Sequence, residues 1–391
     1  MKITNDIRYV GVNDHDVDLF EGQYPVERGM AYNSYVVLDE KVSVFDTVDA
    51  NFVEEWLGNL KSLLGAAAPD YLVVQHMEPD HSAGIAAFMN AYPTAKIVSS
   101  APAFKMMLGF FGTDWSERKI VVKEGDSLNT GKHTFTFVGA PMVHWPEVIV
   151  TYDAADKVLF SADGFGKFGA NDIEDPEGWD CEARRYYFGI VGKYGVQTTA
   201  LLKKASGLEL NVICPLHGPV LDTPEKIAHA IKQYTTWAGY GVESEGVLIA
   251  YTSVYGHTKN AVMKLTEALK AKGCPKVVTA DLARDEMFET IEDAFRYGKI
   301  VLATTTYNGD IFPFMKTFIH HLLERNYQNR AIGFVENGAW APQAARIMRG
   351  MFEKSKNISF CENVVTINSA LDVKSEEALD ALADEMIKFT A

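Results

Sequence analysis

The sequence predicts two domains, an α+β domain with antiparallel strands followed by an α/β domain built on a doubly wound parallel sheet. Three observations predict this. The chain has 391 residues, enough for two or three domains with separate cores. Strand-like runs come in neighbouring pairs in the first part, whereas strands and helices alternate in the second. A polar, glycine-rich segment at residues 238–246 is typical of a linker, so we place the domains at residues 1–245 and 246–391.

Composition excludes several classes of protein. The chain is 47% hydrophobic and 23% charged, unlike disordered or low-complexity sequences. No apolar run approaches the roughly 18 residues of a membrane helix, and the start carries no secretory signal pattern. The net charge of −15 disfavours nucleic acid as a partner. The four cysteines are widely spaced, with no C-x-x-C, so we expect a reduced, cytoplasmic protein without a disulfide framework.

The first domain contains three pairs of candidate strands. Short polar turns at residues 39–41 and 154–156 join two of these pairs and are typical of hairpins. The pairs are residues 34–38 with 42–46, 119–122 with 133–138, and 148–153 with 157–161. Helical patterns are predicted between them at about residues 51–64, 82–91, 102–110 and 182–204.

The second domain alternates regularly. Its predicted strands are residues 247–251, 276–280, 299–304, 330–335 and 363–367. Helical patterns follow them at residues 258–272, 286–297, 312–323, 342–352 and 375–389. In the first of these, Ala261, Leu265 and Leu269 recur every fourth residue and form an apolar face. Five strands alternating with helices predict an open, doubly wound parallel sheet.

A dense group of metal-binding residue types follows the apolar run at residues 71–74. His76, Glu78, Asp80 and His81 fall within six positions. Alternate residues of an extended segment project to the same side, so the first three can converge on one point. The mixed nitrogen and oxygen donors suit first-row transition metals better than Ca²⁺ or Mg²⁺. We therefore predict a transition-metal site here.

Three further candidate ligands each follow a strand-like run: His144, Asp163 and His217. Taken alone, a histidine or aspartate in a loop is more often structural than a metal ligand. Together with the first group they make four histidines and three carboxylates. That number suits two metals with one carboxylate bridging them.

The second domain begins with a strand followed by the segment Thr252-Ser-Val-Tyr-Gly-His-Thr258 and a helix. Small hydroxyl residues and a glycine before a helix N-terminus favour phosphate binding. The segment is neither a Walker loop nor G-x-G-x-x-G, so dinucleotide binding of the Rossmann type is not supported. Two more loops, residues 304–310 and 336–342, also follow strands, and Tyr307 and Trp340 offer aromatic surface for a flat ring.

The H-x-E-x-D-H pattern at residues 76–81, with His144, Asp163 and His217, resembles the metallo-β-lactamase-like fold. That fold usually has histidine at the position of Glu78. Glu78 and the second domain together resemble the flavodiiron proteins (A-type flavoproteins), over essentially the whole chain. The resemblance implies an αββα sandwich carrying two irons. It implies one iron held by His76, Glu78 and His144, the other by Asp80, His81 and His217, and a bridging Asp163.

The second domain resembles flavodoxins, with FMN as ligand. That resemblance implies that the phosphate is held by Ser253, Tyr255, Gly256, His257 and Thr258. It implies that the isoalloxazine ring is held by Thr305, Tyr307, Asn308, Gly309, Asn337, Gly338 and Trp340.

The flavodiiron resemblance implies an oxidoreductase that passes electrons through FMN to a non-haem diiron site. There it reduces O₂ to water, NO to N₂O, or both, with no separate protein acid or base assigned. The implied donor is external, such as rubredoxin or a reduced deazaflavin. The implied assembly is a head-to-tail homodimer or a dimer of dimers, in an anaerobe's cytoplasm. One departure is a short segment between Asp163 and His217, which bears on access to the metals.

Two other functions are compatible with parts of the sequence. The first is a zinc-dependent hydrolase of the metallo-β-lactamase type with a flavodoxin appendage, against which Glu78 argues. The second is a flavodoxin-like electron carrier with a purely structural first domain, against which the full ligand set argues. Tyr186 and Tyr187 are expected only to pack within a helix.

Overall fold

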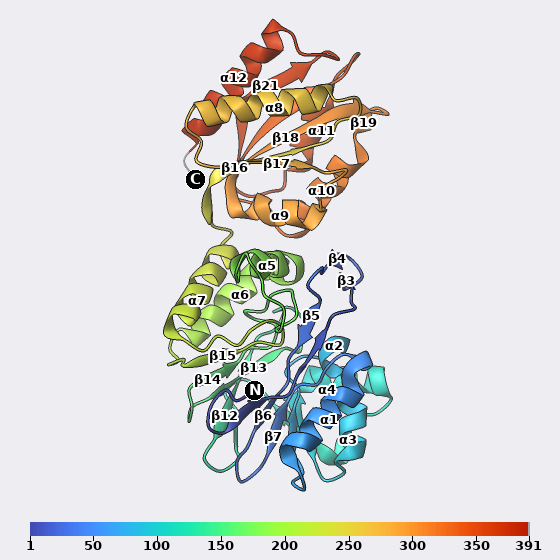
Figure 1. Ribbon diagram of the computed structural model, residues 1–391, viewed down its shortest axis with the longest axis vertical. Helices are drawn as coiled ribbons and strands as arrows, with labels where there is room; N and C mark the ends of the chain where they lie inside the picture. The colour runs from blue at the N-terminus through green and yellow to red at the C-terminus, as the bar shows by residue number, and fades with distance from the viewer. Residues whose placement is uncertain (390–391) are drawn as a thin grey trace. The chain divides into compact units, whose positions relative to one another are not determined.

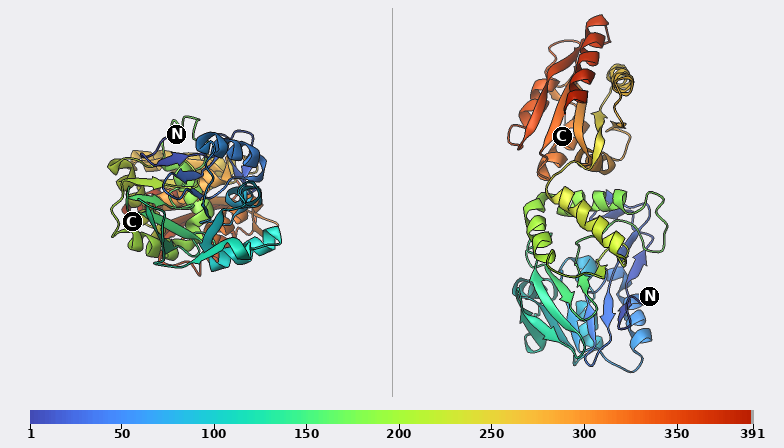
Figure 2. Two further views of the ribbon diagram at one scale, coloured as in Figure 1. Left: turned by 90° about the horizontal axis from the view of Figure 1, so that it is seen from below. Right: turned by 90° about the vertical axis from the view of Figure 1, so that its left-hand side faces the viewer.

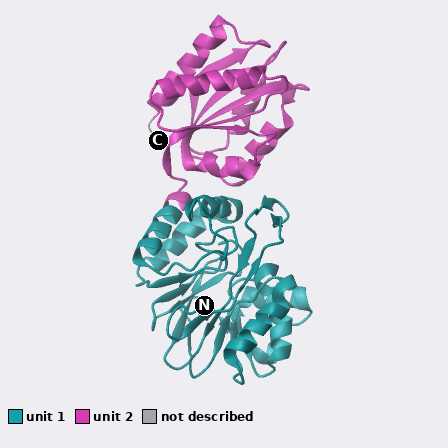
Figure 3. Cartoon of the chain, in the orientation of Figure 1, with its two compact units in different colours: residues 1–235 teal, residues 236–391 magenta. Residues whose placement is uncertain are grey.

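The computed structural model describes residues 1–389 and divides into two compact units, Met1–Thr235 and Thr236–Ala391 (Figure 3). Along the chain, the boundary between the units falls within α7 (Pro224–Ala238). Past this helix, the Arg330 guanidinium donates to the backbone carbonyls of Tyr240 at 2.8 Å and Gly241 at 3.0 Å. Residues 240 and 241 are therefore tied to the second unit. The predicted limits, 1–245 and 246–391, remain a prediction.

Unit 1 contains two sheets packed face to face (Figure 1). The first has the order β1 (Ile7–Tyr9), β6 (Tyr35–Val37), β7 (Ser43–Phe45), β8 (Tyr71–Val73), β9 (Lys96–Ser100) and β10 (Lys119–Val122). The second has the order β11 (Ser127–Asn129), β12 (Thr134–Gly139), β13 (Ile149–Asp153), β14 (Val158–Phe160) and β15 (Val212–Cys214). Two small ribbons pair β2 (Val12–Asp14) with β5 (Met30–Tyr32) and β3 (Leu19–Phe20) with β4 (Tyr24–Pro25).

Two of the three predicted strand pairs are confirmed. β6 pairs antiparallel with β7, and β13 pairs antiparallel with β14. The pair of residues 119–122 with 133–138 is wrong, because β10 runs parallel to β9 in the first sheet while β12 pairs with β11 and β13 in the second. β7, β8, β9 and β10 are mutually parallel neighbours, so the sheets are mixed and not only antiparallel.

Helices cover the outer faces of both sheets and complete an αββα sandwich (Figures 1 and 2). On the side of the first sheet lie α1 (Val53–Leu64), α2 (Pro79–Ser82), α3 (Ile85–Ala91) and α4 (Ala101–Phe111). On the side of the second lie α5 (Asp180–Tyr186), α6 (Gly195–Ala205) and α7. The single helix predicted for residues 182–204 is wrong, since a π-helical turn (Tyr187–Val191) and a 3₁₀ turn (Gly192–Tyr194) interrupt it. Within residues 1–389, no helix combines the length and apolarity required to cross a membrane.

Aromatic rings fill the space between the two sheets of unit 1. Phe45 of β7 and Phe160 of β14 stack with ring centroids 4.0 Å apart and planes 7° from parallel. Phe135 of β12 meets the edge of Phe45 at 5.1 Å. All three are fully buried. This contact fixes the separation of the sheets whose strand ends carry the candidate ligands.

Unit 2 is an open sheet with the order β17-β16-β18-β20-β21, all parallel. The strands are β16 (Ser244–Tyr251), β17 (Val277–Asp281), β18 (Tyr297–Tyr307), β20 (Arg330–Asn337) and β21 (Ile358–Ile367). The helices are α8 (His257–Ala271), α9 (Met287–Arg296), α10 (Pro313–Glu324), α11 (Ala344–Met351) and α12 (Val373–Lys388). All five predicted strands and helices are confirmed, and the order is flavodoxin-like. A short β19 (Asp310–Ile311), antiparallel to β18, was not predicted.

We expect Phe160→Ala to lower the free energy of unfolding of unit 1 by about 3–5 kcal/mol, because it removes the stacked ring and leaves a cavity. Chemical denaturation followed by circular dichroism measures this. Leu108→Ala is the matched control, since Leu108 is 54% exposed in the same unit. Equal losses for the two variants would contradict the proposed importance of the stack.

Candidate metal centre

Loops at the strand ends of both sheets of unit 1 bring all seven predicted ligands together. His76 and Glu78 lie in the segment after β8, and Asp80 and His81 lie on α2. His144, Asp163 and His217 follow β12, β14 and β15. The side chains form two groups of converging donor atoms, one of His76, Glu78, His144 and Asp163, the other of Asp80, His81 and His217.

In the first group, two imidazoles face two carboxylates. The Nε2 atom of His144 lies 3.0 Å from Glu78 Oε2 and 3.1 Å from Asp163 Oδ2. The Nε2 atom of His76 lies 3.2 Å and 3.3 Å from the same two oxygens. Four donor atoms thus surround one point.

In the second group, the Nε2 atoms of His81 and His217 lie only 2.9 Å apart. Asp80 Oδ2 lies 3.3 Å from the first and 3.2 Å from the second. Asp163 Oδ1 lies 3.4 Å from His81 Nε2 and 4.0 Å from His217 Nε2. Asp163 therefore turns one oxygen to each group, as a bridging carboxylate would.

The donor set fits metal ions. Both carboxylate oxygens of Asp80 and of Asp163 are buried and have no hydrogen-bond partner among the residues that the structure describes. Such oxygens are costly unless a cation satisfies them. Two non-glycine residues beside Asp163, Ala162 at φ 49° and Phe165 at φ 66°, adopt the sparsely populated left-handed region. Backbone strain of this kind clusters at functional sites.

Hydrogen bonds on the far ring nitrogens set the histidine tautomers. The carbonyl of Ala31 can only accept, so His217 Nδ1 at 2.8 Å donates to it. The Nε2 lone pair of His217 then faces the second group, ready for a metal. His76 Nδ1 lies 2.8 Å from the fully buried Glu147 carboxylate, which also accepts from the Met77 amide. Glu147 orients His76 in the same way.

The histidines of the centre hold protons strongly. Burial acts to lower the pKa of His144, but the close carboxylates of Asp163 and Glu78 outweigh it and raise that pKa to about 9. Burial acts to raise the pKa of Asp163, but the charge of His76 and the close imidazoles of His144 and His81 hold it well below its usual range. Protons on the imidazoles thus supply the positive charge that balances the carboxylates, a role that metal cations would otherwise have.

Sequence reasoning missed three residues around the centre. Glu147 stood in the His144 segment without an assigned role. Asp46 is buried and accepts from the backbone amide of Gln75 at 2.7 Å and from its side chain at 3.0 Å, which fixes the segment carrying His76. Tyr186 is buried with its ring 5.4 Å from that of His217, so its role is not helix packing alone. Each of these residues contacts a ligand segment that is distant in the sequence, so no local sequence pattern identifies it.

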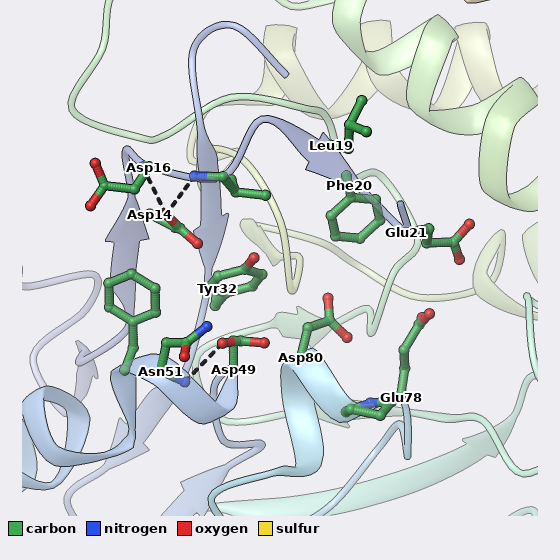
Figure 4. Close-up of a pocket in the computed structure, with 13 residues that line it drawn as sticks. Asp14, Asp16, Leu19, Phe20, Glu21, Tyr32, Asp49, Asn51, Glu78 and Asp80 are labelled. Carbon is green, nitrogen blue, oxygen red and sulfur yellow. Dashed lines mark hydrogen bonds between the residues drawn. The ribbon is translucent and has the colours of Figure 1, made fainter. Parts of the chain in front are cut away.

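A cavity of about 540 Å³ opens beside the two groups (Figure 4). Glu78 and Asp80 point into it from the floor, and Phe20 and Glu21 face them from the β3–β4 ribbon. Asp14, Asp16 and Asp49 add further negative charge to the lining. Burial and the charge of Glu78 raise the pKa of Glu21 to about 7. This cavity is therefore an acidic entrance to the centre, and we call it the acidic mouth.

A second cavity, of about 290 Å³, lies in unit 2 at the carboxyl ends of β16, β18 and β20. This is the point where the strand order reverses, and open α/β sheets bind ligands there. Eight predicted flavin residues line it: Ser253, Tyr255, His257, Thr258, Thr305, Tyr307, Asn337 and Gly338. The other four, Gly256, Asn308, Gly309 and Trp340, lie in the same three loops but outside this lining. Ser369, which also lines the cavity, was not predicted.

The second cavity fits a flavin. Tyr255 is 91% and Trp340 83% exposed, which is unusual for large aromatic side chains and leaves surface for a flat ring. The Ser253 hydroxyl accepts from the amides of Gly256 and Lys259, each at 3.2 Å, which shapes the loop at the start of α8. Gly256 has φ +91°, which a side chain would strain. As ligands and flavin contacts, the residues named from the sequence remain a proposal.

Metal affinity should rise with pH between 6.5 and about 9, because metal binding must displace the proton that His144 holds up to its raised pKa. The stability of the fold without metal has the opposite pH dependence and falls as the pH rises. Protonated His144 stabilises it fully below pH 6.5, and this contribution is lost as the pH passes about 9. Chelator competition across this range measures the affinity, with a slope of roughly tenfold per pH unit for each displaced proton. An affinity that falls with pH would contradict this account.

Models of known protein families match both units. Residues 30–218 match the model of the ODP family beta lactamase, and residues 248–368 match a flavodoxin domain. The two matches correspond to the sandwich of unit 1 and the parallel sheet of unit 2, which confirms the predicted metallo-β-lactamase-like and flavodoxin-like folds.

Relatives match over nearly the whole chain. The rubredoxin-oxygen oxidoreductase of Megalodesulfovibrio gigas is 30% identical over 357 residues, covering 89% of this chain and 87% of that protein. The nitric oxide reductase of Moorella thermoacetica is 29% identical, covering 90% of each chain. The solved structure of the rubredoxin oxygen:oxidoreductase from Desulfovibrio gigas superposes with a TM-score of 0.92 at 27% identity, covering 99% of this chain and 97% of that one. The flavodiiron protein of Giardia intestinalis shares the fold, with a TM-score of 0.92 at 23% identity. On its fold, its paired metal-binding groups and these relatives, the chain belongs to the flavodiiron protein family.

Proposed function

We propose that this protein is a flavodiiron oxidoreductase that reduces O₂ to water, NO to N₂O, or both. Asp163 is the observation that carries the proposal, since its two buried oxygens each face a separate group of histidine and carboxylate donors. Two metals close enough to share one carboxylate can act on one small substrate. Relatives named rubredoxin-oxygen oxidoreductase and nitric oxide reductase support both gases.

The proposed ligands are those named from the sequence. His76, Glu78 and His144 would hold one iron, and Asp80, His81 and His217 the other, with Asp163 between them. FMN would bind in the cavity of unit 2. When bound, the two irons and FMN together supply the electrons for gas reduction.

The chain's own residues prepare the centre for that chemistry. Ala31 and Glu147 fix the tautomers of His217 and His76. The anionic ligands Glu78, Asp80 and Asp163 favour the more positively charged, oxidised metals. Both reductions consume protons as well as electrons. Glu21, a carboxyl that lines the cavity beside the centre, is placed to relay protons toward it.

The hydrolase alternative is not favoured. Glu78 contributes an oxygen where a zinc hydrolase of this fold usually has histidine. The acidic mouth formed with Asp14, Asp16, Glu21 and Asp49 would also repel anionic substrates of a hydrolase. Small neutral gases are not affected by that charge. The relatives, one named as an oxidoreductase and the other as a reductase, support the same choice.

An external carrier would supply the electrons. We propose rubredoxin, after the name of the M. gigas relative, with a reduced deazaflavin as the other candidate. A head-to-tail homodimer, or a dimer of such dimers, would bring the FMN of one subunit to the irons of another. We also propose that the protein acts in the cytoplasm.

The first test is composition and turnover of protein purified without oxygen. We expect iron and FMN to copurify and O₂ or NO to be consumed when reduced donor is added. The double variant Glu78→Ala, Asp163→Ala should keep FMN but lose iron. Its gas consumption should fall by more than the roughly 10–100-fold that follows loss of a metal's outer partner.

Glu117→Ala is the matched control, an exposed carboxylate of the same unit. It should retain iron and turnover. Gas consumption by the double variant at the wild-type rate would place the reaction outside the diiron centre. Zinc in place of iron, with hydrolysis and no gas consumption after iron reconstitution, would favour the hydrolase.

A further inference from the structure

An apolar cavity lies in unit 1 between the second sheet and α6. Its floor is formed by Val138, Val150 and Leu159 of β12, β13 and β14. Leu201, Leu202 and Ala205 of α6 form its roof. All of the surface facing into it is apolar, and its interior volume is about 20 Å³.

The cavity adjoins two of the proposed ligands through the chain. Val143, in its wall, directly precedes His144, and Gly164, also in its wall, directly follows Asp163. Val143 and Gly164 are buried. The roof residues Leu201, Leu202 and Ala205 are only half-buried. The cavity thus extends from loops that carry ligands to the partly exposed face of α6.

Water has little to hold it in this cavity. The Ser161 hydroxyl donates to the carbonyl of Gly164 at 2.7 Å, and the Thr198 hydroxyl donates to the carbonyl of Tyr194 at 3.1 Å. Both of these hydroxyl hydrogens are therefore used within the protein. A third hydroxyl belongs to the lining residue Tyr234, but no polar surface faces into the cavity. Apolar cavities without polar partners stay dry and take up small apolar guests such as xenon.

Volume and chemistry together select the guest. About 20 Å³ slightly exceeds the roughly 10–15 Å³ that one water-sized molecule needs. A peptide, a flavin or a carbohydrate is far too large, whereas a diatomic gas fits. O₂ and NO are both neutral, weakly polar diatomic gases, and both are substrates under the proposed function.

We propose that this cavity is a gas-entry site, which admits O₂ or NO to the diiron centre from the face of α6. The inference rests on the proposed function for the identity of the gas. Access to the centre would then be divided. The acidic mouth, with its charged side chains and larger volume, would carry protons and water, and the apolar cavity would carry the gas.

Ala205→Phe should block this route, because the larger side chain fills a space lined by carbon. We expect kcat/KM for the gas to fall by about threefold to tenfold while kcat at saturating gas stays within about twofold, the pattern of lost access with intact chemistry. Leu202→Ala should widen the route and should not lower kcat/KM; a fall in kcat/KM would count against the route. Val196→Phe is the matched control, because Val196 lies on the same helix but is 78% exposed.

Both gases are measured with each variant of the iron- and FMN-loaded protein. A route chosen by apolarity alone should lower kcat/KM for O₂ and NO by the same factor. A fall for one gas only would assign the cavity to that gas. Iron and FMN content at wild-type levels in Ala205→Phe separates a blocked route from a misfolded variant.

Xenon under pressure tests the cavity without any turnover. Crystals of the wild-type protein should show a xenon atom among Val143, Leu159 and Leu202, and crystals of Ala205→Phe should not. An absence of xenon from the wild-type cavity, or an unchanged kcat/KM in Ala205→Phe, would overturn the inference. A loaded wild-type protein that consumes neither gas would instead refute the proposed function, and the xenon result would still report on the cavity.

Discussion

The whole first unit depends on one buried carboxylate that no other protein group neutralises by hydrogen bonding. Asp163 has its two oxygens directed at different pairs of imidazoles, and neither oxygen has a hydrogen-bond partner within the described chain. Such a group destabilises the fold unless positive charge is held on both sides of it. Four loops from two sheets must therefore be fixed relative to one another, and the stacked Phe45 and Phe160 rings between the sheets keep them so.

Features encoded over short stretches could be predicted from the sequence. The alternation of residues 246–389 gave every strand and helix of the parallel sheet, because each strand and its crossover helix are neighbours in sequence. Four of the seven proposed ligands could be named because metal-binding residue types are rarely so dense as at His76–His81. The other three, His144, Asp163 and His217, gained weight only beside that group and through the family resemblance. The family followed from the combination of Glu78 with a flavodoxin-like partner domain. Iron, rather than zinc, rested on that resemblance and not on spacing.

Features that depend on distant contacts could not be predicted. The β10 strand resembles a hairpin partner of β12, but it completes the first sheet because β9 offers it a parallel edge. The long helix after Asp180 is broken at Tyr187, where the chain must bring Tyr186 against His217 while α6 covers the second sheet. Asp46, which follows β7, and Glu147, in the turn before β13, orient the ligand segment from other parts of the chain. Their side chains are ordinary carboxylates until the fold brings them to His76 and Gln75.

The bonds from Arg330 to the residues before β16 bear on how the two halves can be separated. Arg330 is only 2% exposed, and two of its carbonyl partners, Tyr240 and Gly241, lie upstream of the predicted boundary. A proteolytic cut after Glu245 would take these carbonyls away and leave a buried cation less satisfied. An isolated flavin fragment would therefore need the segment from Thr236 onward. The segment from Thr236 to β16 is therefore part of the fold of unit 2 and not merely a linker.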